Sequence, residues 1–173
     1  MAAKKYLALV AGKKKEVAGL VTSAGAGDDG KIVALDATGK LDTSVMPVGI
    51  GADTKSIVTS ENLAAGDFVN VYDNAGTVSA RRADASSNAK EAHGFVLAGV
   101  TSPAAATVYF EGTNTALTGL TKGVKYFLSH STPGGVVEAA SLTTTAGHIV
   151  QEIGQSLSTT EISFEPQSTV ELA

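Results

Sequence analysis

The chain has 173 residues and a formal net charge of −4, with 43% apolar and 17% charged residues, a balance that excludes a disordered protein. The absence of cysteine excludes disulfides, thiolate metal sites and a catalytic thiol. No apolar run approaches the roughly 18 residues of a transmembrane helix. The 19 glycines and the shortage of large aromatic residues predict a thin core, so we expect part of the stability to come from subunit contacts.

The N-terminal segment 1–22 is basic and the rest of the chain is acidic. It carries five lysines and one glutamate, a formal charge of +4, whereas the remainder carries 8 basic and 16 acidic residues, a charge of −8. Its apolar stretch is too short for a signal peptide and runs into three lysines, so we read it as mature sequence and expect cytoplasmic assembly. A basic arm predicts docking on a negative partner. Because phosphates would repel the acidic body, an acidic protein surface is favoured over nucleic acid, with a solvated arm as the alternative.

The first third of the chain predicts short, loosely organised elements. Residues 4–10 and 15–21 either pair as a hairpin or extend as arms. The glycine- and serine-rich stretch 23–30 has the composition of a flexible linker. Residues 31–36 and 40–45 are expected to form a β-hairpin around the turn at 37–39. We therefore divide the chain into a basic arm (1–22), a linker with a hairpin unit (23–54) and a body (55–173).

The body reads as a succession of short strands separated by turn residues. In 67–73, Phe68, Asn70 and Tyr72 alternate with Val69 and Val71, and neither face is purely polar, so both faces should be covered, the second layer being available from another subunit. The fold class predicted is all-β, a small β-sandwich or barrel with an extended N-terminal arm and a short β-hairpin linker unit, assembled as a trimer. Nine strands are expected, at 56–60, 67–73, 77–82, 94–100, 106–112, 124–129, 135–140, 148–154 and 161–166.

Candidate chemical motifs are weak. Residues 25–31 fit the spacing of a phosphate-binding loop, but Ile32 stands where Ser or Thr should bind the metal ion. The three histidines lack zinc-ligand spacing and are expected at the surface or at strand ends, and the turn aspartates do not form a calcium loop. We therefore expect no catalytic residues, no cofactor and no metal. The one dense polar cluster of the body is either a binding hot spot or a charged, protected edge strand; it consists of Arg81, Arg82 and Asp84.

Several segments nevertheless resemble a recurrent pattern of tailed-bacteriophage structural proteins. GKIVALDATGKLDTSVMPVGIGAD (30–53) is followed by SENLAAGDFVNVYDNAGTVSARRADAS (60–86) and GFVLAGV (94–100). The pattern continues in ATVYFEGTNTALTGLTKGVKYFLSHSTPGG (106–135) and HIVQEIGQSLSTTEISFEP (148–166). The resemblance covers nearly the whole chain, from Tyr6 to Pro166, and is to the capsid decoration (cement) and head-fibre proteins.

That resemblance implies a noncatalytic homotrimer on the outer surface of the virion, bound to the major capsid protein at junctions between capsomers and stabilising the shell. It implies no nucleic-acid or membrane partner. The alternative is a head-fibre, tail-fibre or spike component that contacts the host surface. From charge and position we expect shell contacts at Lys4, Lys5, Tyr6, Leu7, Lys13, Lys14 and Lys15. We expect contacts between the three subunits at Ile32, Val33, Leu35, Leu41, Val45 and Met46.

Overall fold

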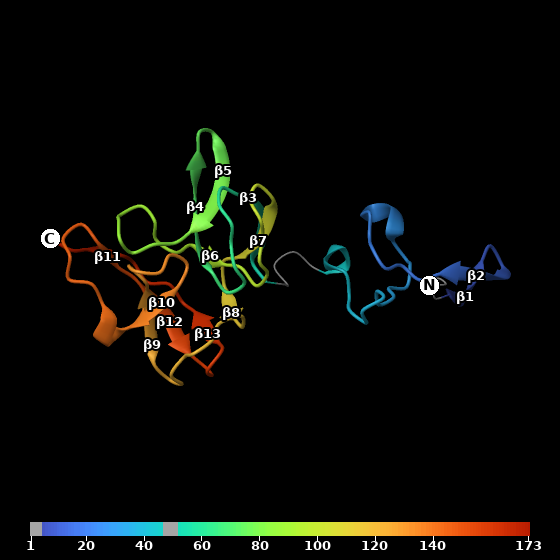
Figure 1. Cartoon of the computed structure of the whole chain (residues 1–173). Helices are drawn as coiled ribbons and strands as arrows, with labels where there is room; N and C mark the ends of the chain where they lie inside the picture. Colours follow the sequence, from blue (N-terminus) through green and yellow to red (C-terminus); the bar gives the residue numbers. More distant parts are fainter. Residues whose placement is uncertain (1–4, 47–51) are drawn as a thin grey trace. The chain divides into compact units, whose positions relative to one another are not determined.

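The computed structural model describes residues 5–46 and 52–173 and divides the chain into two compact units, 1–51 and 52–173 (Figure 1). Over these described residues the secondary structure is mostly strand, and the helical elements found there are three short 3-10 turns. The all-β class predicted from the sequence is therefore confirmed. Within the described residues no helix is both long enough and apolar enough to cross a membrane.

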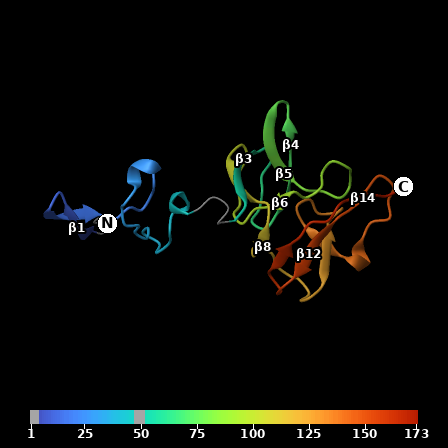
Figure 2. The same cartoon turned by 180° about the vertical axis from the view of Figure 1, so that it is seen from behind.

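The first unit begins with a β-hairpin (Figure 2). Strand β1 (Lys5–Val10) pairs antiparallel with β2 (Lys13–Ala18) through a two-residue turn. Both turn residues, Ala11 and Gly12, have positive φ angles of 50° and 76°. This is the backbone geometry whose twist matches that of the flanking strands in tight hairpins. Of the two readings of the basic arm, the structure shows the paired hairpin.

The hairpin expected over 31–36 and 40–45 is wrong. Residue Val33 instead makes an isolated parallel bridge to Leu20, and the proposed return strand contains a 3-10 turn, η2 (Thr43–Val45). The carboxylate of Asp42 accepts hydrogen bonds from the N–H and hydroxyl of Ser44 at 2.9 and 2.6 Å and so caps that turn. Such local side-chain bonds compete with strand pairing. Another 3-10 turn, η1 (Ala26–Asp28), occupies the predicted linker.

The second unit contains a closed five-stranded barrel in the order β3-β5-β4-β6-β7 (Figure 1). Strands β3 and β5 are parallel, and the other four pairings are antiparallel. Closure removes the exposed edges that a sheet of this size would otherwise present. The strands are β3 (Thr54–Thr59), β4 (Phe68–Asn74), β5 (Thr77–Arg82), β6 (Gly94–Phe95) and β7 (Ala105–Tyr109).

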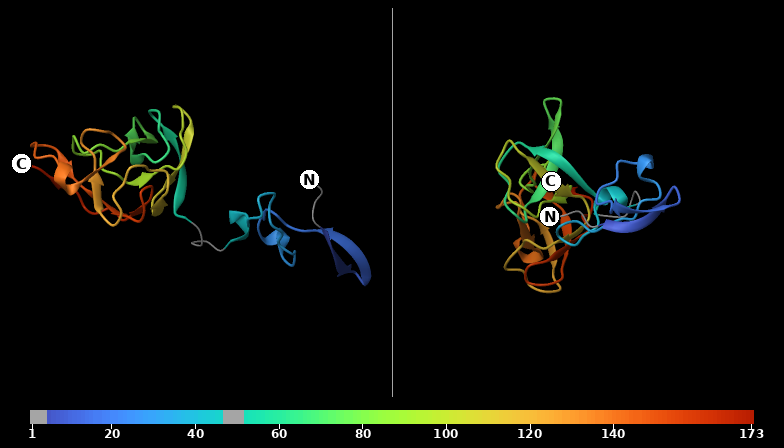
Figure 3. Two further views of the ribbon diagram at one scale, coloured as in Figure 1. Left: turned by 60° about the horizontal axis from the view of Figure 1, so that its bottom comes forward. Right: turned by 90° about the vertical axis from the view of Figure 1, so that its right-hand side faces the viewer.

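A second sheet packs against the barrel, in the order β10-β9-β12-β13-β8 (Figure 3). A further short pair joins β11 to β14. Strands β8 and β14 fall outside the predicted set; both are only two or three residues long. The elements are β8 (Gly112–Asn114), β9 (Lys125–Leu128), β10 (Val136–Glu138), η3 (Ala139–Ser141), β11 (Ile149–Val150), β12 (Glu152–Ser156), β13 (Ile162–Phe164) and β14 (Val170–Glu171).

Strands β4 and β6 supply side chains to two separate cores. Val69 of β4 and Val96, directly after β6, are buried inside the barrel, whereas Phe68 and Phe95 are buried between the barrel and the second sheet, where both pack on Phe164. Alternation along a strand sends neighbouring side chains to opposite faces. The prediction that these strands are covered on both faces is correct, and the second layer comes from the same chain.

The short strand β6 fits only because it carries a glycine at its start. A Cβ atom at Gly94 would lie 2.5 Å from the carbonyl oxygen of Tyr109 and 2.8 Å from Val108 Cγ1. At Gly99, five residues later, the nearest atom to such a Cβ would be 3.5 Å away. Neither glycine has a positive φ, so backbone conformation penalises alanine at neither site, whereas Gly94 is buried in β6 and Gly99 is exposed outside the strands.

We therefore expect Gly94→Ala to destabilise the protein by about 3 kcal/mol, because overpacking forces the backbone of β7 aside. Gly99→Ala, the matched control, should change the free energy of unfolding by less than about 1 kcal/mol. Urea unfolding of the full chain, followed by circular dichroism, measures both. Equal losses in the two variants would contradict this account of the barrel.

Candidate interaction surfaces

The two units differ completely in burial. No side chain of the described residues 5–46 is buried, and every buried apolar residue of the described chain belongs to the second unit. Most of the large apolar side chains that remain exposed lie in the first unit. They are Leu7, Leu9, Val10, Val21, Ile32, Val33, Leu35 and Leu41. Concentrated exposure of this kind marks an interaction surface.

The hairpin has two different faces. Tyr6 and Val17 form a cross-strand pair and are half-buried, and the Tyr6 hydroxyl oxygen accepts a hydrogen bond from the N–H of Ile32 at 3.4 Å. This face therefore lies against the rest of the first unit. The opposite face presents Leu7 and Leu9, which are 75% and 74% exposed.

Charged side chains frame these two leucines. Leu7 is paired across the strands with Glu16, and Leu9 with Lys14. Glu16 also forms an ion pair with Lys5 at 3.1 Å. The exposed face of the hairpin, defined by Lys5, Leu7, Leu9, Lys14 and Glu16, thus combines an apolar strip with a basic margin.

The residues predicted to contact a shell do not share one surface. Strand alternation places Lys5, Leu7 and Lys14 on the exposed face and the remaining described members of the set on the other. Those members are Tyr6, Lys13 and Lys15. Lys4 lies outside the described residues. Leu9 was missed by the sequence reasoning, although period-2 alternation from Leu7 would have identified it.

The residues predicted to contact other subunits are accessible. Ile32, Val33, Leu35 and Leu41 are exposed, and Val45 and Met46 are half-buried. The structure brings three of them, Val33, Val45 and Met46, together around a depression of about 440 Å³ that Leu20 also lines. Leu20 was not in the predicted set, since its approach depends on the bridge to Val33.

Carboxylates organise the loops of this unit. Asp28 Oδ2 accepts the N–H of Ala24 at 2.6 Å, and Asp36 Oδ1 accepts the N–H groups of Thr38 and Lys40 at 2.8 and 2.9 Å. These bonds, with the Lys31 ammonium 2.6 Å from Asp28, hold the pKa values of both carboxyls below their ordinary range. Hydrogen bonding to Ser44 does the same for the pKa of Asp42. Lys31, the lysine of the apparent phosphate loop, is thus engaged by Asp28.

Acid should loosen these loops. A carboxylate with a lowered folded-state pKa stabilises the fold above its unfolded pKa, and that stabilisation is lost as the pH falls through the folded value. We expect the amides of Ala24, Thr38 and Ser44 to lose hydrogen-exchange protection below about pH 3.8, the ordinary value for Asp. Amide exchange followed by NMR between pH 5 and 2.5 tests this. Unchanged protection at pH 2.5 would contradict it.

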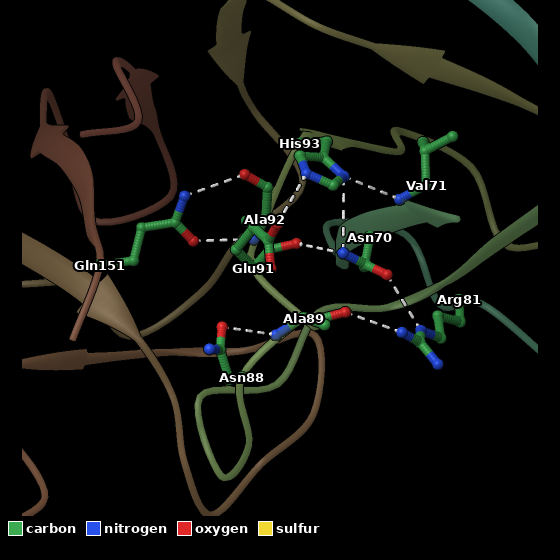
Figure 4. A network of polar contacts seen from close by, with 9 residues as sticks. All are labelled: Asn70, Val71, Arg81, Asn88, Ala89, Glu91, Ala92, His93 and Gln151. Atoms are coloured by element: carbon green, nitrogen blue, oxygen red, sulfur yellow. Dashed lines mark hydrogen bonds and ion pairs between the residues drawn. The ribbon is translucent and has the colours of Figure 1, made fainter. Parts of the chain in front are cut away.

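Arg81 and Arg82 of the body's polar cluster end β5, an interior strand because β3 and β4 pair with its two sides, and Asp84 lies two residues after the strand. The edge-strand reading of this cluster is therefore wrong. The guanidinium of Arg81 donates from Nε to Asn70 Oδ1 at 3.0 Å and from Nη2 to the carbonyl of Ala89 at 2.8 Å (Figure 4). Glu61 accepts the N–H and a guanidinium nitrogen of Arg82 at 2.6 and 3.1 Å.

The histidines lie apart in two places. His93 Nδ1 accepts the N–H of Val71 at 3.0 Å, next to Asn70 (Figure 4). His130 and His148 are half-buried with ring centroids 6.0 Å apart, a proximity that their separation in sequence did not predict. Among the described residues, no three His, Asp or Glu side chains gather as a metal ion would require.

The chain matches no protein-family model, no curated protein and no solved structure.

Proposed function

We propose that the chain is a capsid decoration (cement) protein of a tailed bacteriophage, a homotrimer bound to the outer surface of the head at junctions between capsomers. The observation that carries the proposal is the complete lack of buried side chains in 5–46. A segment without a core cannot offset the conformational entropy of ordering its backbone. Its well-defined turns and hairpin therefore call for cover from other chains.

The exposed surfaces of the first unit call for two different kinds of partner. The depression around Val33, Val45 and Met46 combines apolar side chains with a formal charge of only −1, from Asp28, Asp29 and Lys31, which suits contact between identical copies about a threefold axis. The exposed face of the hairpin adds lysines to its leucines, which suits an acidic foreign surface. One unit then supplies both subunit contacts and attachment to the major capsid protein.

The second unit suits the exposed part of such an assembly. Residues 52–173 carry 6 basic and 12 acidic residues, a formal charge of −6, and they have their own two cores. An acidic body with its own cores keeps the trimer soluble, while the first units of the three subunits bind the shell together. Moderate contacts at each arm then sum to a high avidity for the shell.

Replacing both exposed leucines, Leu7→Ser with Leu9→Ser, should weaken binding to the shell by about 100-fold or more, since each buried leucine contributes about 1.5–3 kcal/mol. The double variant Val78→Ser with Leu157→Ser is the control, because these body residues are also more than half exposed. Co-sedimentation with purified heads lacking the protein measures binding. Equal binding by both double variants would refute attachment through the hairpin.

Trimer formation is tested separately. The double variant Ile32→Asp with Leu35→Asp should lower the mass in solution from three times the 17.4 kDa chain mass to a single chain, because six buried charges cannot be tolerated at one contact. Light scattering after size exclusion gives the mass, and the leucine variants above should remain trimeric. A wild-type monomer would exclude the proposal.

Copy number distinguishes a decoration protein from a fibre or spike. We expect quantitative mass spectrometry of purified virions to give a copy number comparable to that of the major shell protein. A count of a few copies per particle would instead assign the chain to a fibre or spike.

A further inference from the structure

The basic residues of the body are gathered in one place. Of the six lysines and arginines in 52–173, three line a single open depression of about 430 Å³ on the barrel: Arg81, Arg82 and Lys90. The unit as a whole is acidic, and a random placement of its six basic residues would not gather half of them around one depression. This depression, here called the arginine pocket, is independent of the surfaces used in the proposed function.

Arg81 is held in place by neutral groups only. Its Nε and Nη2 atoms bond the side-chain oxygen of Asn70 and the carbonyl of Ala89, and its guanidinium carbon lies 4.0 Å from the centroid of the Tyr72 ring. None of its ion-pair or hydrogen-bond partners among the described residues is a carboxylate. Its charge is therefore uncompensated by direct contact.

The support behind Arg81 is itself rigid. Asn70 is only 1% exposed, and its amide nitrogen donates to the carbonyl of Glu91 at 2.8 Å (Figure 4). The same loop is fixed on its other side, because Gln151 exchanges two hydrogen bonds with the backbone of Ala92. A guanidinium that Asn70 and Ala89 hold in place before a ligand arrives loses little entropy on binding.

The two other cations have incomplete partnerships. Arg82 is bonded to Glu61 through Nη2, but its Nε atom is buried without a hydrogen-bond partner in the described part of the chain. Lys90 Nζ lies 3.9 Å from Asp84 Oδ2, the outer limit of an ion pair. Buried donors without a partner are uncommon in native structures, and the long ion pair leaves the ammonium of Lys90 available to a ligand.

The lining also fixes the charge and the class of ligand. Three cations and two carboxylates, Glu61 and Asp84, leave a formal charge of +1. A ligand with one negative charge, such as a single carboxylate, balances this net charge, whereas a dianionic phosphate would leave a net negative charge in the pocket. The remaining lining groups, Ser60, Tyr72 and Asn74, together with those carboxylates, can exchange hydrogen bonds with hydroxyl groups.

We propose that the arginine pocket binds an acidic sugar residue of the uronic-acid class, with the sugar carboxylate on Arg81 and Lys90 and its hydroxyls on Glu61 and Asp84. Arginine recognises carboxylates through two parallel N–H bonds, and the Nη1 side of Arg81 has no partner among the described residues. The depression is open, so a residue within a polysaccharide can enter as well as a free monosaccharide.

Titration of the full-length protein with D-glucuronate, followed by ¹H–¹⁵N NMR, tests the proposal, with D-glucose and glucose 6-phosphate as probes of charge. Glucuronate should shift the signals of Arg81 Nε, Glu61 and Lys90, and D-glucose should not. Oligomers of galacturonate should bind more tightly than the monosaccharide if the source is a polysaccharide. No shift with either uronate, or tighter binding of glucose 6-phosphate or of a glutamate-rich peptide, would overturn the assignment.

Variants locate the site. Arg81→Gln and Lys90→Gln should each weaken uronate binding by about tenfold or more, and Lys122→Gln, an exposed lysine outside the pocket, should leave it unchanged. Because Arg81 also bonds Asn70, Lys90→Gln serves as the variant that does not disturb the fold, with thermal unfolding as the check. Uronate affinity retained in Lys90→Gln and Arg81→Gln alike would overturn the proposal.

Discussion

The pairing of β4 with β6 is the contact on which the rest of the body depends. Phe68 lies opposite Phe95 and Val69 opposite Gly94, so the strand pair sends two aromatic rings to one side and the Val69 side chain to the other, where Val96 joins it directly after β6. The aromatic side joins the barrel to the second sheet through Phe164, and the aliphatic side fills the barrel. Since both cores share this pair, neither layer has a complete interior without the other.

The first unit shows what happens when such a shared core is lacking. Its order comes from hydrogen bonds made by Asp28, Asp36 and Asp42 and from the tight turn at Ala11 and Gly12. These contacts fix local conformation but remove little apolar surface from water, and area removed from water is what stabilises a fold. These local bonds shape the unit, and in the proposed assembly the other subunits and the shell would supply the apolar contacts that it lacks.

Sequence reasoning located the body strands because alternation and turn residues are local signals. Residues 67–73 alternate clearly and form β4. The stretch 94–100 forms a strand only at 94–95. The chain then bends, and Val100 makes only an isolated bridge to Leu63. The closure of the barrel, with β3 parallel to β5, depends on pairings between distant segments that no local pattern records. The hairpin expected over 31–36 and 40–45 does not form, because the side chain of Asp42 accepts a hydrogen bond from the N–H of Ser44 and caps a 3-10 turn. This local bond replaces the pairing of 40–45 with 31–36.

The same limit applies to the sites. The exposure of Ile32 and Leu35 could be expected from their place in a short, unsupported segment. The arginine pocket could not, because Arg81 takes its partners from β4 and from the loop at Ala89. The doublet of arginines indicated the place, and only the fold shows that Tyr72, Asn70 and Lys90 meet there.

The position of β3 bears on how the protein matures during synthesis. This first strand of the body finds its partners in β5 and β7, the latter ending at Tyr109. While the ribosome is still extending the chain toward that residue, β3 has an unfilled side and the coreless leading unit has already emerged. The barrel can therefore close only after residues 105–109 have been added, so the body must complete its fold late in synthesis, through contacts between segments far apart in the chain.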